Sequence, residues 1–201
     1  MELKISDFEL NLKRLLDILF SSLMLVVLSP LFLFLSILIK IDSKGHIFYK
    51  QQRLGMYGKP FYIYKFRTMI EEAEKGGMPQ LSSEGDCRIT RIGRILRKYR
   101  IDELPQFINV LIGDMSVVGP RPERAYFESQ IMERVPYFSI VHKVRPGITS
   151  LGMVKYGYAN SIEKMLDRLK YDIIYMENIS LLLDLKILIY TIQTVISGRG
   201  V

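Results

Sequence analysis

The longest feature of the hydropathy pattern is an uncharged run of 22 residues near the N-terminus, from Ile18 to Ile39. As a straight helix this run would measure about 33 Å, which is enough to cross a bilayer. Ser29 and Pro30 interrupt it near the middle, and a proline there removes a helix hydrogen bond and clashes with the preceding turn. The pattern therefore predicts a kinked helix in which the Ser29 hydroxyl satisfies a freed carbonyl.

The charges that flank this run leave its topology open. Lys13 and Arg14 precede it, and the cations that follow it are Lys40, Lys44, Lys50 and Arg53. Since cations on both sides give no gradient for the positive-inside rule, the helix can cross the membrane as a kinked span or dip into one leaflet and return. Lys13 and Arg14 would then lie at the interface, in contact with a lipid phosphate or as snorkelling anchors.

Shorter periodicities predict the other elements. The alternation from Ile47 to Met69, around a turn at Leu54–Pro60, predicts a β-hairpin. Helical spacing and capping residues predict helices over Ile70–Lys75, Thr90–Tyr99, Asp102–Ile112, Arg124–Val135, Asn160–Met176 (with a capping box of Asn160 and Glu163) and Ser180–Ile196. A loop is predicted over Gly76–Asp86 and a strand-like connector over Ile148–Tyr158. The predicted fold class is therefore α+β and mostly helical, with one small hairpin.

Two of the predicted helices have the pattern of helices that lie at a membrane interface. The helix near Thr90 alternates arginines with Ile92, Ile95 and Leu96, and such a stripe can face a core or the headgroup region. The last helix is apolar on most sides but carries Asp184 and Lys186 in its first turns, which favours packing or an interfacial position over a span.

The composition narrows the classes of partner. The mean hydropathy of +0.15 is high for a purely soluble protein, and the net charge of +7 implies acidic partners such as anionic lipid, nucleotide or nucleic acid. The 201 residues fit one domain or a compact two-part unit. Cys87 is the single cysteine, so an internal disulfide and a cysteine-based zinc site are excluded.

An acidic pair, Asp102-Glu103, lies between clusters of arginines and is the candidate reaction centre. Upstream, arginines recur every three residues, at positions 88, 91, 94 and 97, which predicts one row along a helix. Asp102 is of the type that caps a helix N-terminus, with Pro105 tolerated in the first turn. The helix dipole and the guanidinium charges would keep Asp102 ionised at neutral pH, and such an aspartate can be a nucleophile towards phosphorus.

Glu103 is the candidate metal ligand, because Mg²⁺ favours one or two carboxylates together with substrate phosphate oxygens. The alternative for the pair is purely structural: a capping aspartate followed by a first-turn glutamate, which is a common arrangement. Two arginine-proline motifs favour the functional interpretation. Arg121 between Pro120 and Pro122, and Arg145 before Pro146, sit on stiff backbone that suits a phosphate fork. Lys65 and Arg67, on one side of the second predicted strand, would add cations, so the residues together predict a phosphate pocket.

Several blocks carry a resemblance to a known family. They are KRLLD at 13–17, SP at 29–30, YKFRTM at 64–69, the segment from RITRIG to GPRPE at 88–123, VRPGIT at 144–149 and MENISLLLDLKIL near the end. They resemble the bacterial sugar transferase family, small monotopic phosphoglycosyl transferases that start membrane-bound glycan assembly. The resemblance spans nearly the whole chain, and this chain resembles the minimal catalytic form.

The resemblance implies a fold and a place in the cell. Residues 1–43 would form a re-entrant membrane helix, broken at Ser29-Pro30, with both ends at the cytoplasmic face of the bacterial inner membrane. Residues 44–201 would form the catalytic domain, with nucleotide-sugar contacts around Ile148–Tyr158. Membrane lipid would be a partner, nucleic acid would not, and a homodimer is plausible.

The resemblance also implies a reaction. Asp102 would attack the β-phosphate of a UDP-sugar and release UMP, and polyprenol (undecaprenyl) phosphate would then take the sugar phosphate. Mg²⁺ at Glu103 and the arginines Arg67, Arg97, Arg121 and Arg145 would stabilise the phosphate charge. A non-catalytic membrane scaffold and a basic nucleic-acid-binding module are the alternatives. The sugar itself is not set by the sequence.

Overall fold

The computed structural model describes residues 5–71, 73, 79–81, 85–157 and 159–198. Its helices are α1 (Asp7–Val27), α2 (Ser29–Asp42), α3 (Arg91–Lys98), α4 (Phe107–Ile112), α5 (Ala125–Arg134), α6 (Leu151–Lys155), α7 (Ile162–Glu177) and α8 (Leu181–Ile196), with 3₁₀ helices η1 (Met56–Gly58), η2 (Ile101–Gln106) and η3 (Pro136–Lys143). Its strands are β1 (Phe48–Leu54), β2 (Pro60–Phe66), β3 (Ser116–Val118) and β4 (Gly147–Thr149). The predicted mostly helical α+β class is confirmed.

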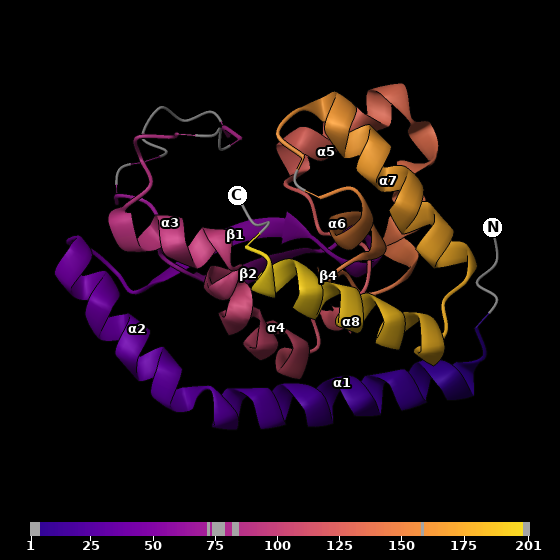
Figure 1. Ribbon diagram of the computed structural model, residues 1–201. Coiled ribbons are helices and arrows are strands. Elements are labelled where there is room, and N and C mark those ends of the chain that lie inside the picture. The colour runs from indigo at the N-terminus through magenta and orange to yellow at the C-terminus, as the bar shows by residue number, and fades with distance from the viewer. Residues whose placement is uncertain (1–4, 72, 74–78, 82–84, 158, 199–201) are drawn as a thin grey trace.

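The N-terminal helices form a bent arm. Figure 1 shows α1 and α2 along one side of the molecule, with the other elements inside the bend. The two axes differ by 59°, and the break falls at Leu28, between the two helices. The hydroxyl of the next residue, Ser29, donates to the Val26 carbonyl at 2.8 Å. Pro30 occupies the first turn of α2, where its missing N–H costs nothing. The predicted kink and the predicted role of the serine hydroxyl are both confirmed.

The length and hydropathy of the arm can be compared with those of a membrane span. Within the described residues, no helix by itself is both long and apolar enough to span a membrane. The bent pair of α1 and α2 meets that test of length and composition when the two helices are taken together.

A buried polar cluster fastens α1 to the rest of the chain. The Asp17 carboxylate accepts hydrogen bonds from the Ser116 hydroxyl at 2.7 Å and from the Val117 N–H at 3.1 Å. Four residues earlier on the same face, Lys13 forms an ion pair with Asp184 of α8. Because both contacts reach elements about one hundred residues or more away in sequence, the KRLLD block is a docking motif for the arm.

The predicted hairpin is present. Strands β1 and β2 pair antiparallel, with Phe48 opposite Phe66 and Leu54 opposite Pro60. The connecting turn contains Gly58 with φ of +69°, a left-handed conformation that glycine adopts without steric cost. β2 carries Lys65 towards η2, and this is how the hairpin contributes to the site described below.

A second, parallel pair of strands was not predicted. β3 and β4 pair with Ser116 opposite Gly147 and Val118 opposite Thr149. A Cβ on Gly147 would lie 2.1 Å from the Gly119 amide nitrogen, so the close approach of the two backbones requires glycine. Just beyond β3, the Pro120 carbonyl accepts from the Gly147 N–H at 2.9 Å, so the backbones of the two arginine-proline motifs are in contact.

Two local predictions are wrong. The connector over Ile148–Tyr158 was predicted to be strand-like, but α6 begins at Leu151 because the Ser150 hydroxyl caps it by accepting from the Met153 N–H at 3.0 Å. The cap of α7 is Ser161, which accepts from the Lys164 N–H, and not Asn160.

The other helix predictions hold, apart from one segment. α3, α5 and α8 lie within one residue of their predicted bounds, with Thr90 and Ser180 as N-caps of α3 and α8. Of the helix predicted over Ile70–Lys75, residues 70, 71 and 73 are described, and 71 and 73 are in a turn. The rest of it, and most of the Gly76–Asp86 loop, lies outside the described residues.

Candidate active site

The acidic pair lies in η2, directly after α3. The chain enters η2 through Arg100, whose backbone is left-handed, with φ of +54° and ψ of +22°. Asp102 is therefore the second residue of a 3₁₀ helix, and its side chain makes no capping bond to that helix. The prediction that Asp102 caps a helix is wrong, because the sharp turn at Arg100 places the helix start before it. Both Asp102 and Glu103 are buried, with 7% of their surface exposed.

Glu103 is held by cations from two distant segments. Its Oε1 accepts from Lys65 Nζ at 2.7 Å and from Arg121 Nη2 at 3.0 Å, and its Oε2 lies 3.9 Å from Arg100 Nη1. Burial would raise the pKa of the Glu103 carboxyl, but Lys65 and Arg121 outweigh it and hold that pKa well below its usual range. Glu103 is therefore a permanent anion at neutral pH.

Asp102 titrates differently from its neighbour. Burial raises the pKa of Asp102 to about 6, against the opposing Lys65 ammonium and with help from the Glu103 charge. The carboxylate is thus mostly ionised at pH 7, as the sequence predicts, although its pKa is raised because the surrounding positive charge only partly offsets its burial.

A small pocket of about 100 Å³ surrounds the pair. Five cations and the two carboxylates line it: Arg53, Lys65, Arg97, Arg100, Asp102, Glu103 and Arg121. A larger pocket of about 460 Å³ shares Arg53, Lys65, Arg97 and Asp102 with it, and extends past Phe48, Tyr49 and Phe127. Asp102 therefore lies where a phosphate-sized cavity meets one large enough for the rest of a small organic ligand.

Arg121 reaches the pair as predicted from its two prolines. Its guanidinium contacts Glu103, and its backbone N–H donates to Asp172 Oδ2 of α7 at 3.3 Å. Asp172 also accepts from the Gly152 N–H at 3.0 Å, so one buried carboxylate holds the Arg121 loop against α6. The side chain and the backbone of Arg121 are fixed by separate partners.

The arginines of the predicted row lie in different surroundings. Arg97 reaches both pockets and donates from Nε to the Thr68 hydroxyl at 2.9 Å. Arg88 lies before α3 and pairs with Asp86 at 2.6 Å, whereas residues 91 and 94 are exposed on α3. Of the four arginines in the row, Arg97 is the one beside Asp102.

Arg67 does not project from β2 beside Lys65, since the strand ends at Phe66. Its guanidinium donates to the carbonyl of Ser43 at 2.6 Å and to that of Ile39 at 3.3 Å, which joins the wall of the larger pocket to the end of α2. Arg67 is 6% exposed, so its charge serves a buried connection between the arm and the hairpin.

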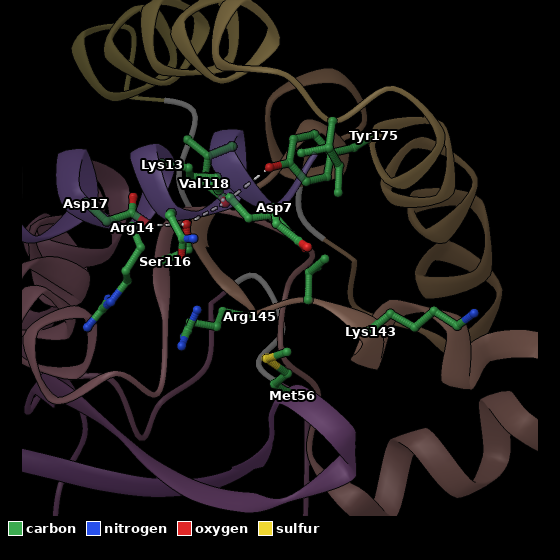
Figure 2. Close-up of a pocket in the computed structure, with 14 residues that line it drawn as sticks. Asp7, Lys13, Arg14, Asp17, Met56, Ser116, Val118, Lys143, Arg145 and Tyr175 are labelled. Atoms are coloured by element: carbon green, nitrogen blue, oxygen red, sulfur yellow. Dashed lines mark hydrogen bonds between the residues drawn. The ribbon is translucent and has the colours of Figure 1, made fainter. Parts of the chain in front are cut away.

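Arg145 lies in a different pocket, which is drawn in Figure 2. This cavity of about 450 Å³ borders α1 and contains Lys13 and Arg14 as well. Arg145 Nε donates to the Gly113 carbonyl at 3.0 Å, and Arg14 donates to the Val110 carbonyl at 2.7 Å, so both arginines satisfy the C-terminal end of α4. A contact of Lys13 or Arg14 with lipid phosphate stays a prediction, and for Lys13 it would compete with Asp184.

Arg53 and Arg100 also line the small pocket, although the sequence did not mark either as a site residue. Arg53 pairs with Glu123, and Glu123 also pairs with Arg168 of α7. Nothing near Arg53 in the sequence indicates this contact, which depends on the hairpin register. For Arg100 the sequence does contain an indication, because this residue continues the three-residue spacing of the arginine row one step further.

The donor set around Glu103 was tested for a magnesium ion. Among the described residues, no three His, Cys, Asp or Glu side chains are grouped closely enough to hold a metal. Glu103 Oε1 already accepts from two cations, while Oε2 lies 3.9 Å from Arg100 Nη1. The residues therefore fit magnesium only through Oε2, with the remaining ligands supplied by phosphate oxygens and water, as is common for this ion.

An acidic pair with unequal pKa values lies inside a cationic pocket that suits an anion such as phosphate, and Arg67 joins the wall of the adjoining pocket to an apolar helical arm. Comparison with protein families agrees with such a site. The chain belongs to the bacterial sugar transferase family, whose model matches residues 8–198.

Several relatives have named activities. A UDP-N-acetylgalactosamine-undecaprenyl-phosphate N-acetylgalactosaminephosphotransferase of Aeromonas hydrophila is 43% identical over 189 residues, which are 94% of this chain and 44% of the relative. A UDP-glucose:undecaprenyl-phosphate glucose-1-phosphate transferase of Klebsiella pneumoniae is 42% identical over 182 residues, 90% of this chain and 39% of the relative. The exopolysaccharide production protein PSS of Rhizobium leguminosarum bv. phaseoli is 40% identical over 199 residues, 96% of this chain and 99% of the relative. The chain thus spans less than half the length of the first two relatives.

Proposed function

We propose that this protein transfers a sugar-1-phosphate from a UDP-sugar to polyprenol (undecaprenyl) phosphate and releases UMP. The observation that carries the proposal is the buried Asp102 carboxylate, mostly ionised at neutral pH, at the junction of a cationic phosphate-sized pocket and a larger one. The activities named for two relatives, one for N-acetylgalactosamine and one for glucose, support the reaction class and leave the sugar open.

In the first step, a carboxylate oxygen of Asp102 forms a bond to the β-phosphorus of the donor. The bond between that phosphorus and the bridging oxygen breaks, and UMP leaves with the electron pair. The enzyme then carries an aspartyl-phosphosugar. Splitting the transfer in this way lets one carboxylate serve a water-soluble donor and a lipid acceptor in turn, with ping-pong kinetics.

In the second step, a phosphate oxygen of the polyprenol phosphate attacks the same phosphorus. The bond to Asp102 breaks and the carboxylate is restored. The product is a polyprenyl-diphospho-sugar, the starting unit of a surface glycan such as a capsule, exopolysaccharide, O-antigen or glycoprotein glycan.

The cations of the small pocket oppose the charge that builds up in both steps. Lys65, Arg97 and Arg121 line the pocket beside Asp102 and can meet phosphate oxygens there without first being reorganised. Magnesium bound at Glu103 would neutralise the diphosphate and the leaving UMP. Glu103 stays ionised because its carboxyl pKa is held low, so it keeps Lys65 and Arg121 in place between turnovers.

The acceptor requires a membrane, and the arm supports this. Large apolar side chains remain exposed along both helices, among them Leu19, Leu23, Val26, Leu33 and Ile37. We propose that α1 and α2 enter one leaflet as a re-entrant pair at the cytoplasmic face of the bacterial inner membrane, with residues 44–201 as the catalytic domain. A homodimer stays a prediction.

A donor panel tests the proposal. The purified protein in lipid vesicles is incubated with UDP-N-acetylgalactosamine, UDP-glucose and other UDP-sugars, with magnesium and undecaprenyl phosphate, and UMP is measured. Release of UMP from at least one donor is expected. Release from none of them would contradict the proposal and favour a membrane-anchored scaffold.

A further inference from the structure

Arg100 occupies a position that an arginine adopts only at a cost. Its φ of +54° is one of two positive values among the non-glycine residues that the structure describes, the other being at Tyr57. A left-handed conformation is sterically unfavourable for a residue with a Cβ. Local bonds hold it: the Arg100 N–H donates to the Arg97 carbonyl at 3.1 Å, and the Arg100 carbonyl accepts from Glu103 at 3.2 Å. Strained residues of this kind cluster at functional sites.

Burial of the Arg100 guanidinium is also unfavourable. Only 14% of it is exposed, and its buried Nε has no hydrogen-bond partner in the described part of the protein. Its nearest carboxylate oxygen, Glu103 Oε2, is 3.9 Å away, which is beyond hydrogen-bonding distance. A desolvated guanidinium with no short contact to an anion is unfavourable unless a further anion joins it.

The other charges of the small pocket cannot supply that anion. Glu103 directs Oε1 to Lys65 and Arg121, at 2.7 and 3.0 Å. Arg53 is paired with Glu123. With five cations against two carboxylates, the pocket keeps an excess of positive charge, and the Arg100 guanidinium stays 3.9 Å from the Glu103 carboxylate.

We propose that Arg100 binds a phosphate oxygen of the nucleoside diphosphate donor and stabilises the transferring phosphoryl group beside Asp102. This assignment rests on the proposed function. The cost of the desolvated guanidinium is offset when the donor fills the pocket, so Arg100 is expected to act in binding and in the first displacement, and not in folding.

The test uses variants that separate charge from backbone strain. Arg100→Asn removes the cation but tolerates the left-handed conformation, and Arg100→Lys keeps a cation without the fork. Arg94→Asn, at an exposed position of α3, is the matched control. UMP release from UDP-N-acetylgalactosamine and UDP-glucose is measured in lipid vesicles at pH 8.5, where Asp102 is ionised in every variant.

We expect Arg100→Asn to melt within a few degrees of the wild type but to lose about 10²–10³-fold in UMP release, as for loss of one preorganised transition-state donor. Arg100→Lys should retain more activity, and Arg94→Asn should match the wild type. Added guanidinium ion should partly restore the Arg100→Asn variant, which a purely structural role would not allow. A wild-type rate in Arg100→Asn, or a loss without rescue that follows a fall in melting temperature, would overturn the proposal.

Binding of UDP without turnover keeps this result distinct from the proposed reaction. If the wild type releases UMP from no donor, the reaction fails, but calorimetric titration with UDP still reports on Arg100. We expect about tenfold weaker UDP binding in Arg100→Asn, the lower range for a lost charge-assisted hydrogen bond. Equal UDP affinity in the two proteins, or no binding by the wild type, would overturn the assignment.

Discussion

Lys65 of the hairpin and Glu103 of η2 form a buried ion pair, with Nζ 2.7 Å from Oε1. The ion pair keeps Glu103 ionised, whereas the positive charges near Asp102 do not outweigh the effect of its burial. The two neighbouring carboxyls therefore differ, with the pKa of Glu103 well below its usual range and that of Asp102 raised to about 6. Adjacent acids with separated pKa values are typical of sites in which each has its own role.

This difference predicts how the reaction depends on pH. Asp102 attacks only as the carboxylate, and its pKa is raised by burial, so protonation removes activity as the pH falls through about 6. The value of kcat/KM for the UDP-sugar, measured from pH 5 to 8, should fall about tenfold per unit below that point and level off above it. A profile that stays flat down to pH 5 would contradict the assignment of Asp102.

A Lys65 variant tests whether the fall in kcat/KM at acidic pH, its acid limb, comes from protonation of Asp102. The Lys65 ammonium opposes the rise in the Asp102 pKa, so Lys65→Gln should move the acid limb of kcat/KM to higher pH as well as lower the plateau. If the variant loses rate but its acid limb stays at the same pH, a group other than Asp102 must titrate in that limb.

Glu103→Gln tests the proposed magnesium ligand. The amide keeps the shape of the side chain but loses the charge that magnesium, Lys65 and Arg121 share, so a higher magnesium concentration for half-maximal UMP release and a lower rate are expected. Glu133→Gln, an exposed position on α5, serves as the control. An unchanged magnesium requirement in Glu103→Gln would move the metal to other ligands.

The docking of α1 predicts a measurable loss of stability. Asp17→Ala leaves the Ser116 hydroxyl and the Val117 N–H without their acceptor, and a buried group left unsatisfied costs about 1–3 kcal/mol. A lower melting temperature in detergent is expected, whereas Asp7→Ala, at an exposed first-turn position, should change little. Equal melting of Asp17→Ala and the wild type would show that α1 is held by its apolar contacts alone.

If the arm is re-entrant, the start of α1 and the catalytic domain after α2 face the same compartment. Cys87 is exposed and is the single cysteine, so an impermeant maleimide can report on the catalytic side. In a Cys87→Ser background, Asp7→Cys reports on the start of α1. Both cysteines should be labelled in inside-out membrane vesicles and protected in intact spheroplasts. Labelling of the two from opposite sides would identify a full span.

Local chemistry could be predicted from the sequence because it depends on neighbours in the chain. The break at Ser29-Pro30, the hairpin turn and the caps at Thr90 and Ser180 all follow from residues within a few positions. The acidic pair could be identified as the candidate site for the same reason. The cap predicted at Asp102 failed because Arg100 adopts a conformation that arginine disfavours, which no local propensity indicates.

Contacts between distant segments decided the rest of the site. Two arginines that share an arginine-proline motif, Arg121 and Arg145, were grouped from the sequence, yet they lie in different pockets. The three-residue pairing of β3 with β4 sends their side chains to opposite partners, Glu103 and Gly113. Pairing of such short strands depends on packing and has no periodic signal.

The most direct test of the account is the intact mass of the enzyme after incubation with a UDP-sugar and magnesium, without lipid acceptor. The wild type is expected to gain the mass of one phosphosugar, with Asp102 as the modified residue in peptide fragments, and to lose it again when undecaprenyl phosphate is added. Asp102→Asn is expected to show neither the added mass nor UMP. A wild-type enzyme that forms lipid-linked product without ever gaining mass, or an Asp102→Asn enzyme that still turns over, would contradict the central role of Asp102.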